Sequence, residues 1–198
     1  MPRAARFDRQ VALERAVELF WSRGYYASSM KHIEQALDMR PGSLYATFGS
    51  KSGLFIEALD AYVERTGENF RLMLDQAPTV IDGLKGYLRS FACVRNAQAP
   101  AQACMLVKTL LEINPEDAQL LAKADAVLAQ VEQRICMALE QARLAGELRP
   151  EVDCPRLARL LQAQMIGLRG FSERDIPNAQ IEALADDMVN MIDAYRHA

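Results

Sequence analysis

Hydroxyl and ammonium groups gather in one short stretch of the sequence, residues 38–51, which reads DMRPGSLYATFGSK. Tyr45, Thr47 and Lys51 lie in this stretch. Such groups are the side-chain donors that hold phosphate oxygens in protein–DNA complexes. Tyr45, Thr47 and Lys51 therefore predict contact with a phosphate backbone. The alternative, a surface loop with one turn of helix, leaves their spacing unexplained.

The same stretch predicts a short helix that begins at Pro41. Proline is favourable in a first helical turn, because its missing N–H would have no partner there. Gly42 and Ser43 add little bulk, so this end of the helix can approach base edges in a major groove, and its N–H groups favour phosphate. Leu44 and Phe48 lie four residues apart and would face inward. The remaining side chains stay on or near the outer face: Ser43, Tyr45, Ala46 and Thr47.

Two further helices precede this one. The first is expected near residues 8–23 with Asp8 as its N-cap, and the second near residues 29–37, capped by Ser28 or Ser29. The turn between the second and third helices requires a residue that tolerates a positive φ, and Asp38 is acceptable there. Two short helices joined by a tight turn make a helix-turn-helix.

Hydrophobic periodicity predicts an all-α protein of about nine helices. A three-helix helix-turn-helix unit is expected at residues 1–50, and a larger helical body, which shares the fourth helix with it, at residues 51–198. Beyond the third helix, we expect helices near residues 51–75, 79–96, 102–113, 115–145, 154–173 and 178–196. Asn114 would cap the long seventh helix, with Pro115 in its first position.

The charge is uneven along the chain. Residues 1–51 hold eight Lys and Arg against five Asp and Glu, although the whole chain carries a net charge of −3. This skew weakly indicates an N-terminal end that faces a polyanion, and ordinary scatter of charge explains it equally well. No apolar run approaches the roughly 18 residues of a membrane span, and no secretory signal precedes the first helix. The sequence thus predicts a cytoplasmic protein without a membrane partner.

Candidate catalytic and metal-binding residues are few. The two histidines, His32 and His197, stand apart, and the four cysteines form no CxxC pair. Neither a Ser-His-Asp nor a Cys-His arrangement is in place, and no ligand set for zinc is present. We therefore expect no enzyme activity, no metal and no cofactor.

Residues 12–62 strongly resemble the DNA-binding domain of the TetR/AcrR family of transcriptional regulators. The matching positions keep the family's order and spacing: Ala16, Leu19-Phe20, Gly24-Tyr25, Ser29, Ile33, Gly42-Ser43-Leu44-Tyr45, Phe48 and Lys51-Ser52-Gly53-Leu54. Asp38 departs from the family, which usually has Gly at this turn.

The resemblance implies a homodimeric, ligand-responsive repressor of a near-palindromic operator. Ser29, Tyr45 and Lys51 would contact phosphates. The residues nearest to the bases would be Arg40, Gly42, Ser43 and Ala46, with Pro41 and Thr47 completing the surface. An arm with Arg3 and Arg6 could reach the adjacent minor groove.

The resemblance weakens after residue 65, so the ligand site must be predicted from residue types. An apolar lining rich in methionine is typical of an adaptable pocket for an unidentified small-molecule inducer. The candidates are Phe70, Met73, Tyr87, Phe91, Cys104, Met105, Leu106, Met137 and Met165. Ordinary core packing is the alternative for each of them.

Cys104 lies in a segment that resembles the sixth helix of a TetR branch in which this cysteine sometimes senses electrophiles or oxidants. Lys108 follows four residues later and could favour the thiolate. Ala103 replaces the Gly that is usual in that branch. A sensing repressor is therefore an alternative function, and a helical binding or adaptor protein is another.

The last two helices suit dimerisation, because both carry apolar stripes and the eighth has small residues that allow close approach. The predicted dimer residues are Leu160, Gln164, Gly167, Leu184, Met188 and Ile192. The alternative is a helix pair that only closes the monomer.

Overall fold

The computed structural model describes residues 8–92 and 104–197. Within these residues it is all-α, which confirms the predicted fold class. Nine α-helices occur in this part of the chain: α1 (Arg9–Arg23), α2 (Met30–Leu37), α3 (Pro41–Phe48), α4 (Lys51–Asp75), α5 (Val80–Ser90), α6 (Met105–Glu112), α7 (Ala118–Leu144), α8 (Cys154–Phe171) and α9 (Asn178–Asn190). A short 3-10 helix, η1 (Met191–Tyr195), follows α9. No described helix is long and apolar enough to cross a membrane.

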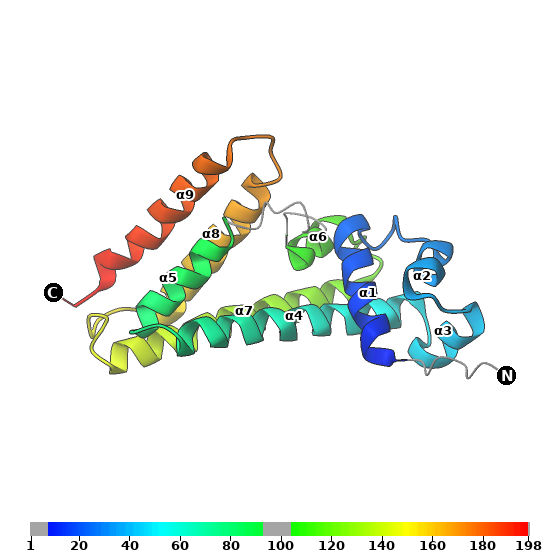
Figure 1. Ribbon diagram of the computed structural model, residues 1–198. Helices are drawn as coiled ribbons and strands as arrows, with labels where there is room; N and C mark the ends of the chain where they lie inside the picture. Colours follow the sequence, from blue (N-terminus) through cyan, green and yellow to red (C-terminus); the bar gives the residue numbers. More distant parts are fainter. Residues whose placement is uncertain (1–7, 93–103, 198) are drawn as a thin grey trace.

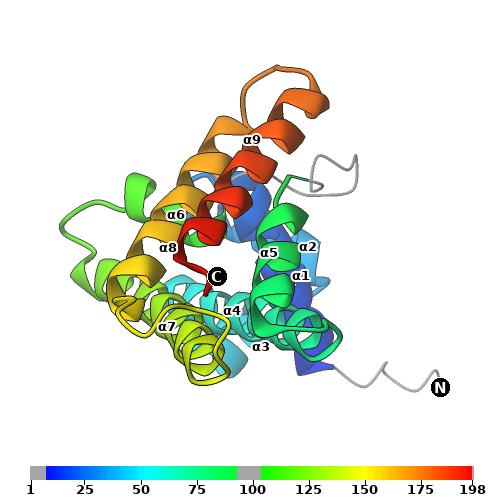
Figure 2. The same cartoon turned by 90° about the vertical axis from the view of Figure 1, so that its left-hand side faces the viewer.

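The two longest helices organise the molecule. Figure 1 shows α4 and α7 side by side along its length, with α1, α2 and α3 at one end and α5, α8 and α9 at the other. Figure 2 looks along this axis from the end that carries the C-terminus. With 25 residues, α4 spans about 38 Å at 1.5 Å per residue. A rigid helix thus connects the two ends.

Local signals place the first three helices. The Asp8 carboxylate accepts from the N–H groups of Gln10 and Val11, which caps α1. Ser29 caps α2, and Asp38 ends that helix in the left-handed conformation with φ 53° and ψ 46°. Because carboxamide and carboxylate side chains tolerate this conformation better than most, Asp38 can replace the glycine of the turn.

Two large cores hold the helices together. The first joins α1, α2, α3 and the first half of α4, and it also takes Met105 and Leu106 from α6 and Val127 from α7. In its centre the rings of Phe20 and Phe55 meet edge to face, with centroids 4.9 Å apart. The N-terminal helices therefore do not form a core that ends at residue 50.

The second core lies at the other end, among α4, α5, α7, α8 and the end of α9. The Glu147 carboxylate accepts from the backbone N–H groups of Val80 and Ile81 at 3.0 and 2.8 Å, so it caps α5 from a distant part of the chain. An antiparallel bridge joins Leu148, which follows α7, to Arg196.

Several helix boundaries differ from the sequence prediction. The helix expected from Pro115 begins only at Ala118, because residues 114–117 form a turn that is held by Tyr26. The Tyr26 hydroxyl donates to the Asp117 carboxylate and accepts from the Asn114 N–H at 2.9 Å. Helix α9 ends at Asn190 instead of continuing toward Arg196. The ends predicted at residues 96 and 102 lie outside the described residues, as do Arg3 and Arg6.

Candidate functional site

Helix α3 presents a slim, exposed surface over a buried anchor. Leu44 and Phe48 are buried in the first core, and Tyr45 is 51% exposed. A Cβ added to Gly42 would meet no atom within 4 Å. The other exposed residues at this end are Arg40, Pro41, Ser43 and Ala46. The first N–H groups of the helix have no intrahelical partner, so they can receive an anion.

Ser29 lies at the N-terminus of α2 in a reciprocal cap. Its hydroxyl oxygen accepts from the His32 N–H at 3.3 Å, and its own N–H donates to His32 Nδ1 at 3.2 Å. The Ser29 side chain is exposed, and its hydroxyl proton remains available for a phosphate oxygen. His32 was not among the predicted site residues, although its position three residues after a capping serine was a usable signal.

Lys51 begins α4 next to Tyr25. Its ammonium lies 4.3 Å from the centre of the Tyr25 ring, a cation–π contact. Partial burial lowers the pKa of Lys51. Tyr25 therefore holds this positive charge at the start of the helix that connects the two ends of the molecule.

Thr47 differs from the other predicted phosphate contacts. Its hydroxyl donates to the backbone carbonyl of Ser43 at 2.8 Å, and the side chain is half-buried. The donor is thus used inside α3, which leaves mainly acceptor capacity outward.

Arg9 of α1 pairs with Glu57 and lies 5.3 Å from the Phe48 ring centre, which ties α1 to α3 and α4.

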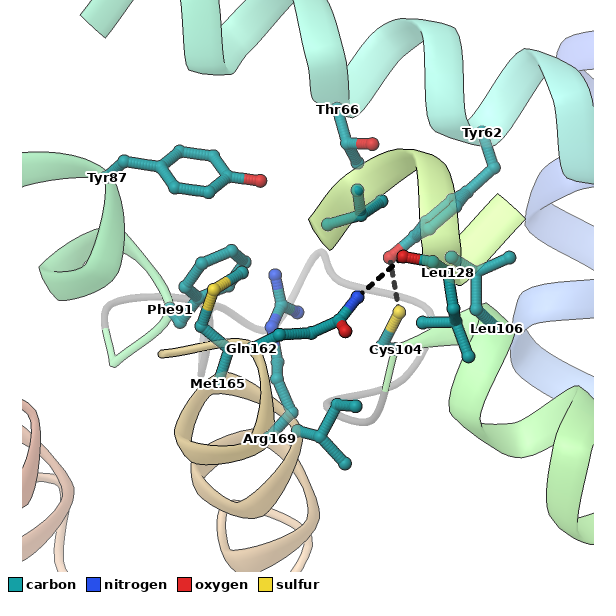
Figure 3. A pocket seen from close by; sticks show the side chains of 12 residues that line it. Tyr62, Thr66, Tyr87, Phe91, Cys104, Leu106, Leu128, Gln162, Met165 and Arg169 are labelled. Carbon is teal, nitrogen blue, oxygen red and sulfur yellow. Dashed lines mark hydrogen bonds between the residues drawn. The ribbon is translucent and has the colours of Figure 1, made fainter. Parts of the chain in front are cut away.

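A pocket of about 50 Å³ lies between α4, α5, α6, α7 and α8. Figure 3 shows its lining side chains. Five of the predicted ligand residues meet here: Tyr87, Phe91, Cys104, Leu106 and Met165. The residues that the sequence prediction missed are Tyr62, Thr66, Leu128, Val131, Gln162, Ile166 and Arg169. Of these, Arg169 follows Met165 by one helical turn, so a search along that face of α8 would have found it.

The other four predicted ligand residues lie elsewhere. The Phe70 ring packs edge-on against Tyr87, with centroids 4.8 Å apart, and faces a smaller neighbouring recess. Met73 lies beside Gly86. Met105 is buried in the first core, and Met137 is 57% exposed on the outside of α7. Methionine content alone did not distinguish core, surface and pocket positions.

Two tyrosines and one arginine dominate the electrostatics of the pocket. Burial raises the pKa of Tyr62 well above its usual value and that of Tyr87 to about 12, so both phenols are neutral at physiological pH. The positive charge of Arg169 opposes both shifts. The Arg169 guanidinium carbon lies 4.4 Å from the Phe91 ring centre, and the residue is only 8% exposed.

Cys104 is half-buried in the wall of this pocket and accepts a hydrogen bond from the Tyr62 hydroxyl at 3.5 Å. The sequence prediction that Lys108 favours the Cys104 thiolate is not supported by its hydrogen bonds. Its ammonium donates instead to the carbonyls of Trp21 and Ser22, at 3.0 and 3.2 Å. The C-terminal carbonyls of α1 carry the negative end of the helix dipole, which attracts the ammonium.

Some of the predicted dimer residues are exposed, and others are buried in the core of the chain. Leu160 and Gly167 are exposed, Gln164 and Leu184 are half-buried, and the Gln164 amide contacts the Met191 sulfur at 3.1 Å. Met188 and Ile192, by contrast, are buried inside one chain. Met188 of α9 belongs to a small core with Ala92 and Leu168, and Ile192 of η1 belongs to the second core, so a partner could reach neither side chain without a rearrangement.

No group of three or more His, Cys, Asp or Glu residues within residues 8–92 and 104–197 is arranged to hold a metal ion. Cys154 is buried, and burial raises the pKa of its thiol to about 11. Burial also raises the pKa of the Cys136 thiol.

Comparisons with known proteins agree with this arrangement. Residues 12–58 match the family described as bacterial regulatory proteins, tetR family, and residues 81–173 match the tetracyclin repressor-like C-terminal domain. The transcriptional repressor ComR of Escherichia coli is 29% identical over 82% of this chain and 78% of its own. The uncharacterized regulator YezE of Bacillus subtilis is 26% identical over 98% of this chain and 100% of its own.

A solved structure gives the same result. It holds a cysteine mutant of the TetR family transcriptional regulator CifR, complexed with a 26-base-pair double-strand operator DNA. Its TM-score to this chain is 0.85, at 31% identity over 96% of this chain and 98% of that one. Both family segments and this full-length similarity lead to one conclusion: the chain belongs to the TetR family of bacterial transcriptional regulators.

Proposed function

We propose that the chain is a ligand-responsive homodimeric repressor that binds a near-palindromic operator in the cytoplasm through α3 of each copy and has no enzyme activity. The observation that carries this proposal is the surface of α3. Its slim N-terminus, exposed Arg40 and Tyr45 and flanking Ser29 and Lys51 match what a major groove and its phosphates require. A similar protein, CifR, is complexed with operator DNA, and ComR is named a repressor.

In a dimer, the two α3 helices occupy successive major grooves only when they lie one DNA turn apart, about 34–36 Å. The pocket can control that distance because Tyr62 and Thr66 belong to α4, the helix that reaches α3. A second connection runs through α6, from Cys104 and Leu106 at the pocket to Lys108 against α1. A ligand releases DNA only to the extent that it binds the two arrangements with different affinity.

Gel shifts test the DNA-binding role. The purified protein is mixed at low salt with DNA that flanks its own gene, with and without heparin competitor. We expect a shift that resists heparin and that an unlabelled copy of the same DNA abolishes. A protein that is dimeric and folded but gives no specific shift would contradict the proposal and favour a helical adaptor.

A second function, sensing of electrophiles or oxidants, is favoured by the position of Cys104 in the pocket wall with its sulfur in contact with Tyr62. Modification of this sulfur would add bulk to a small pocket. We expect Cys104→Ser to remove DNA release by thiol-reactive compounds and Cys136→Ser to leave it intact. Release that persists in Cys104→Ser would rule out this function.

A further inference from the structure

Three adjoining hollow spaces lie along α4 and α7. The first is the pocket of about 50 Å³, which Thr66 and Tyr87 reach from α4 and α5 (Figure 3). The second is a recess of about 10 Å³, which shares Thr66, Tyr87 and Val131 with the pocket. The third is a groove of about 440 Å³, which shares Gly67 and Arg134 with the recess. The three spaces therefore form one line, with the recess as its narrowest part.

The groove is the end of this line that meets solvent. Four of its lining residues are exposed: Glu64, Arg71, Met137 and Gln141. Three others are apolar and at least half-buried: Phe70, Leu74 and Ala138. An apolar lining with a few polar groups is typical of a place where a small molecule leaves water. The groove thus has the character of a mouth to the pocket.

Arg134 of α7 lies at the boundary between the groove and the recess. Its guanidinium Nη1 donates to the backbone carbonyl of Val63 in α4 at 3.1 Å. Gly67, one turn after Val63, makes this position possible, because a Cβ on Gly67 would collide with the guanidinium. The Arg134 side chain therefore bridges the two helices at the narrow part of the line.

This bridge can be broken without leaving a buried group unsatisfied. The Val63 carbonyl also accepts from the Thr66 hydroxyl at 3.1 Å, so it keeps a partner when Arg134 leaves. None of the ion pairs within residues 8–92 and 104–197 includes Arg134. Its charge would be solvated in the open groove, and its long side chain can turn there.

We propose that the ligand of the pocket enters between α4 and α7, and that Arg134 is the gate, closed on Val63 and opened by a turn into the groove. This inference rests on the proposed function, in which the pocket holds an inducer. Because the bond to Val63 favours the closed position, the passage is open for a small fraction of the time, and entry is slowed by that fraction. Gly67 is needed for the closed position only.

The thiol of Cys104 reports access to the pocket, since it lies in the pocket wall. The probe is iodoacetamide, a small uncharged alkylating reagent, and mass spectrometry of peptides from the full-length protein gives a separate rate for each cysteine. Two thiols serve as internal controls. Cys154 is buried and reports unfolding, and Cys136 is half-buried on α7 and lines none of the three spaces.

Two variants should open the gate. Gly67→Ala displaces the guanidinium without removing its charge, and Arg134→Ala removes the side chain. Each loses a hydrogen bond from a charged donor, so we expect alkylation of Cys104 to become about tenfold faster. Arg71→Ala is the matched control, because Arg71 lines the groove but not the recess, and it should react as the wild type does.

A third variant should close the passage. Val131→Phe adds a ring where the pocket and the recess meet, and we expect alkylation of Cys104 to become about threefold slower or more, because close-packed atoms exclude the reagent. The rates at Cys136 and Cys154 should not change in any of these variants. Should Cys154 react faster in one of them, that variant is loosened as a whole, and the other two decide.

Unchanged Cys104 rates in Gly67→Ala and Arg134→Ala would overturn the inference, as would an equal acceleration in Arg71→Ala. Gel shifts with the unmodified proteins separate it from the proposed function. A wild type that binds its operator while the gate variants react at its own rate contradicts the gate alone. Gate variants that react as expected, in a protein that binds no operator, contradict the repressor proposal and leave the passage in place.

Discussion

The ammonium of Lys108 in α6 donates to the backbone carbonyl of Trp21 near the end of α1, over 3.0 Å. The same ammonium reaches the Ser22 carbonyl, and Tyr26 just beyond α1 contacts Asn114 and Asp117 after α6. The N-terminal helices are thus joined to the body through α6 as well as through α4. Because α6 begins at the pocket, this second junction connects the pocket to α1, in addition to the contact between the rings of Tyr62 and Trp21, whose centroids are 5.4 Å apart.

Replacing Lys108 should weaken this junction. Lys108→Met removes two hydrogen bonds from a charged donor at a helix C-terminus, so we expect the free energy of unfolding to fall by about 1–2 kcal/mol. Hydrogen exchange in residues 19–24 should become faster. Lys123→Met, which breaks a surface ion pair with Asp60, is the control and should cost about 1 kcal/mol or less without affecting those amides. Unaltered exchange in residues 19–24 would show that Lys108 does not secure α1.

Phosphate contacts should respond to salt. We expect Lys51→Ala to weaken binding to every DNA sequence and to make the slope of log affinity against log salt shallower by about one per lost contact. Tyr45→Phe removes a neutral donor. It should lower the affinity for every DNA sequence and leave the salt slope nearly unchanged. Filter binding between about 50 and 200 mM salt measures the affinity and its slope for both variants. A change of sequence preference in Lys51→Ala, without loss of affinity, would require a different docking of α3.

Base contacts should instead change preference. Arg40 and Ser43 are exposed at the slim end of α3, and Arg40 has no side-chain bond to the helix that it caps. We expect Arg40→Ala to lower the difference in affinity between the operator and variants of its contacted base pairs by about 1–3 kcal/mol. Selection from a randomised operator library measures this. The control is Arg71→Ala, an exposed arginine far along α4, for which the selected sequences should match those of the wild type.

The fold followed from the sequence because helices depend on local patterns. The caps at Asp8 and Ser29 and the turn at Asp38 involve residues only a few positions apart. The start of α7 was predicted too early because Tyr26, about ninety residues away, holds Asn114 and Asp117 in a turn.

Distant residues limited the prediction of the site in the same way. Arg169 and Tyr87 face one cavity from helices far apart in the chain, and no local pattern encodes that meeting. The stripe with Met188 and Ile192 showed that α9 has an apolar face, but periodicity does not say whether the same chain or a partner covers it.

Acid should remove one stabilising pair. The hydrogen bond from Lys85 holds the pKa of Asp193 below its ordinary value. Because the folded state binds this proton more weakly than the unfolded state, the stabilisation is fully present above the ordinary pKa, near 4, and is lost as the pH falls through the lowered value. We therefore expect Asp193→Asn to destabilise the protein at pH 7 and to differ less from the wild type near pH 3.

Urea unfolding at pH 7, 5, 4 and 3 measures this difference. Asp175→Asn, a change at an exposed carboxylate outside the ion pairs described above, should leave stability unchanged at each pH. A difference between wild type and Asp193→Asn that stays constant down to pH 3 would show that the pair with Lys85 is not its source.

The outer face of α8 gives the sharpest test of the dimer. Gly167 is exposed, and a Cβ placed there meets no atom of the same chain within 4 Å. Gly167→Leu should therefore be harmless to a single chain, and even favourable by about 0.5–1 kcal/mol through helix propensity. If two copies pack through this face, the added side chain separates them. We expect light scattering to report a dimer for the wild type and a folded monomer for Gly167→Leu, with weaker operator binding. Ala122→Leu, at an exposed position of α7, should remain dimeric, and a Gly167→Leu variant that also does so would place the interface elsewhere.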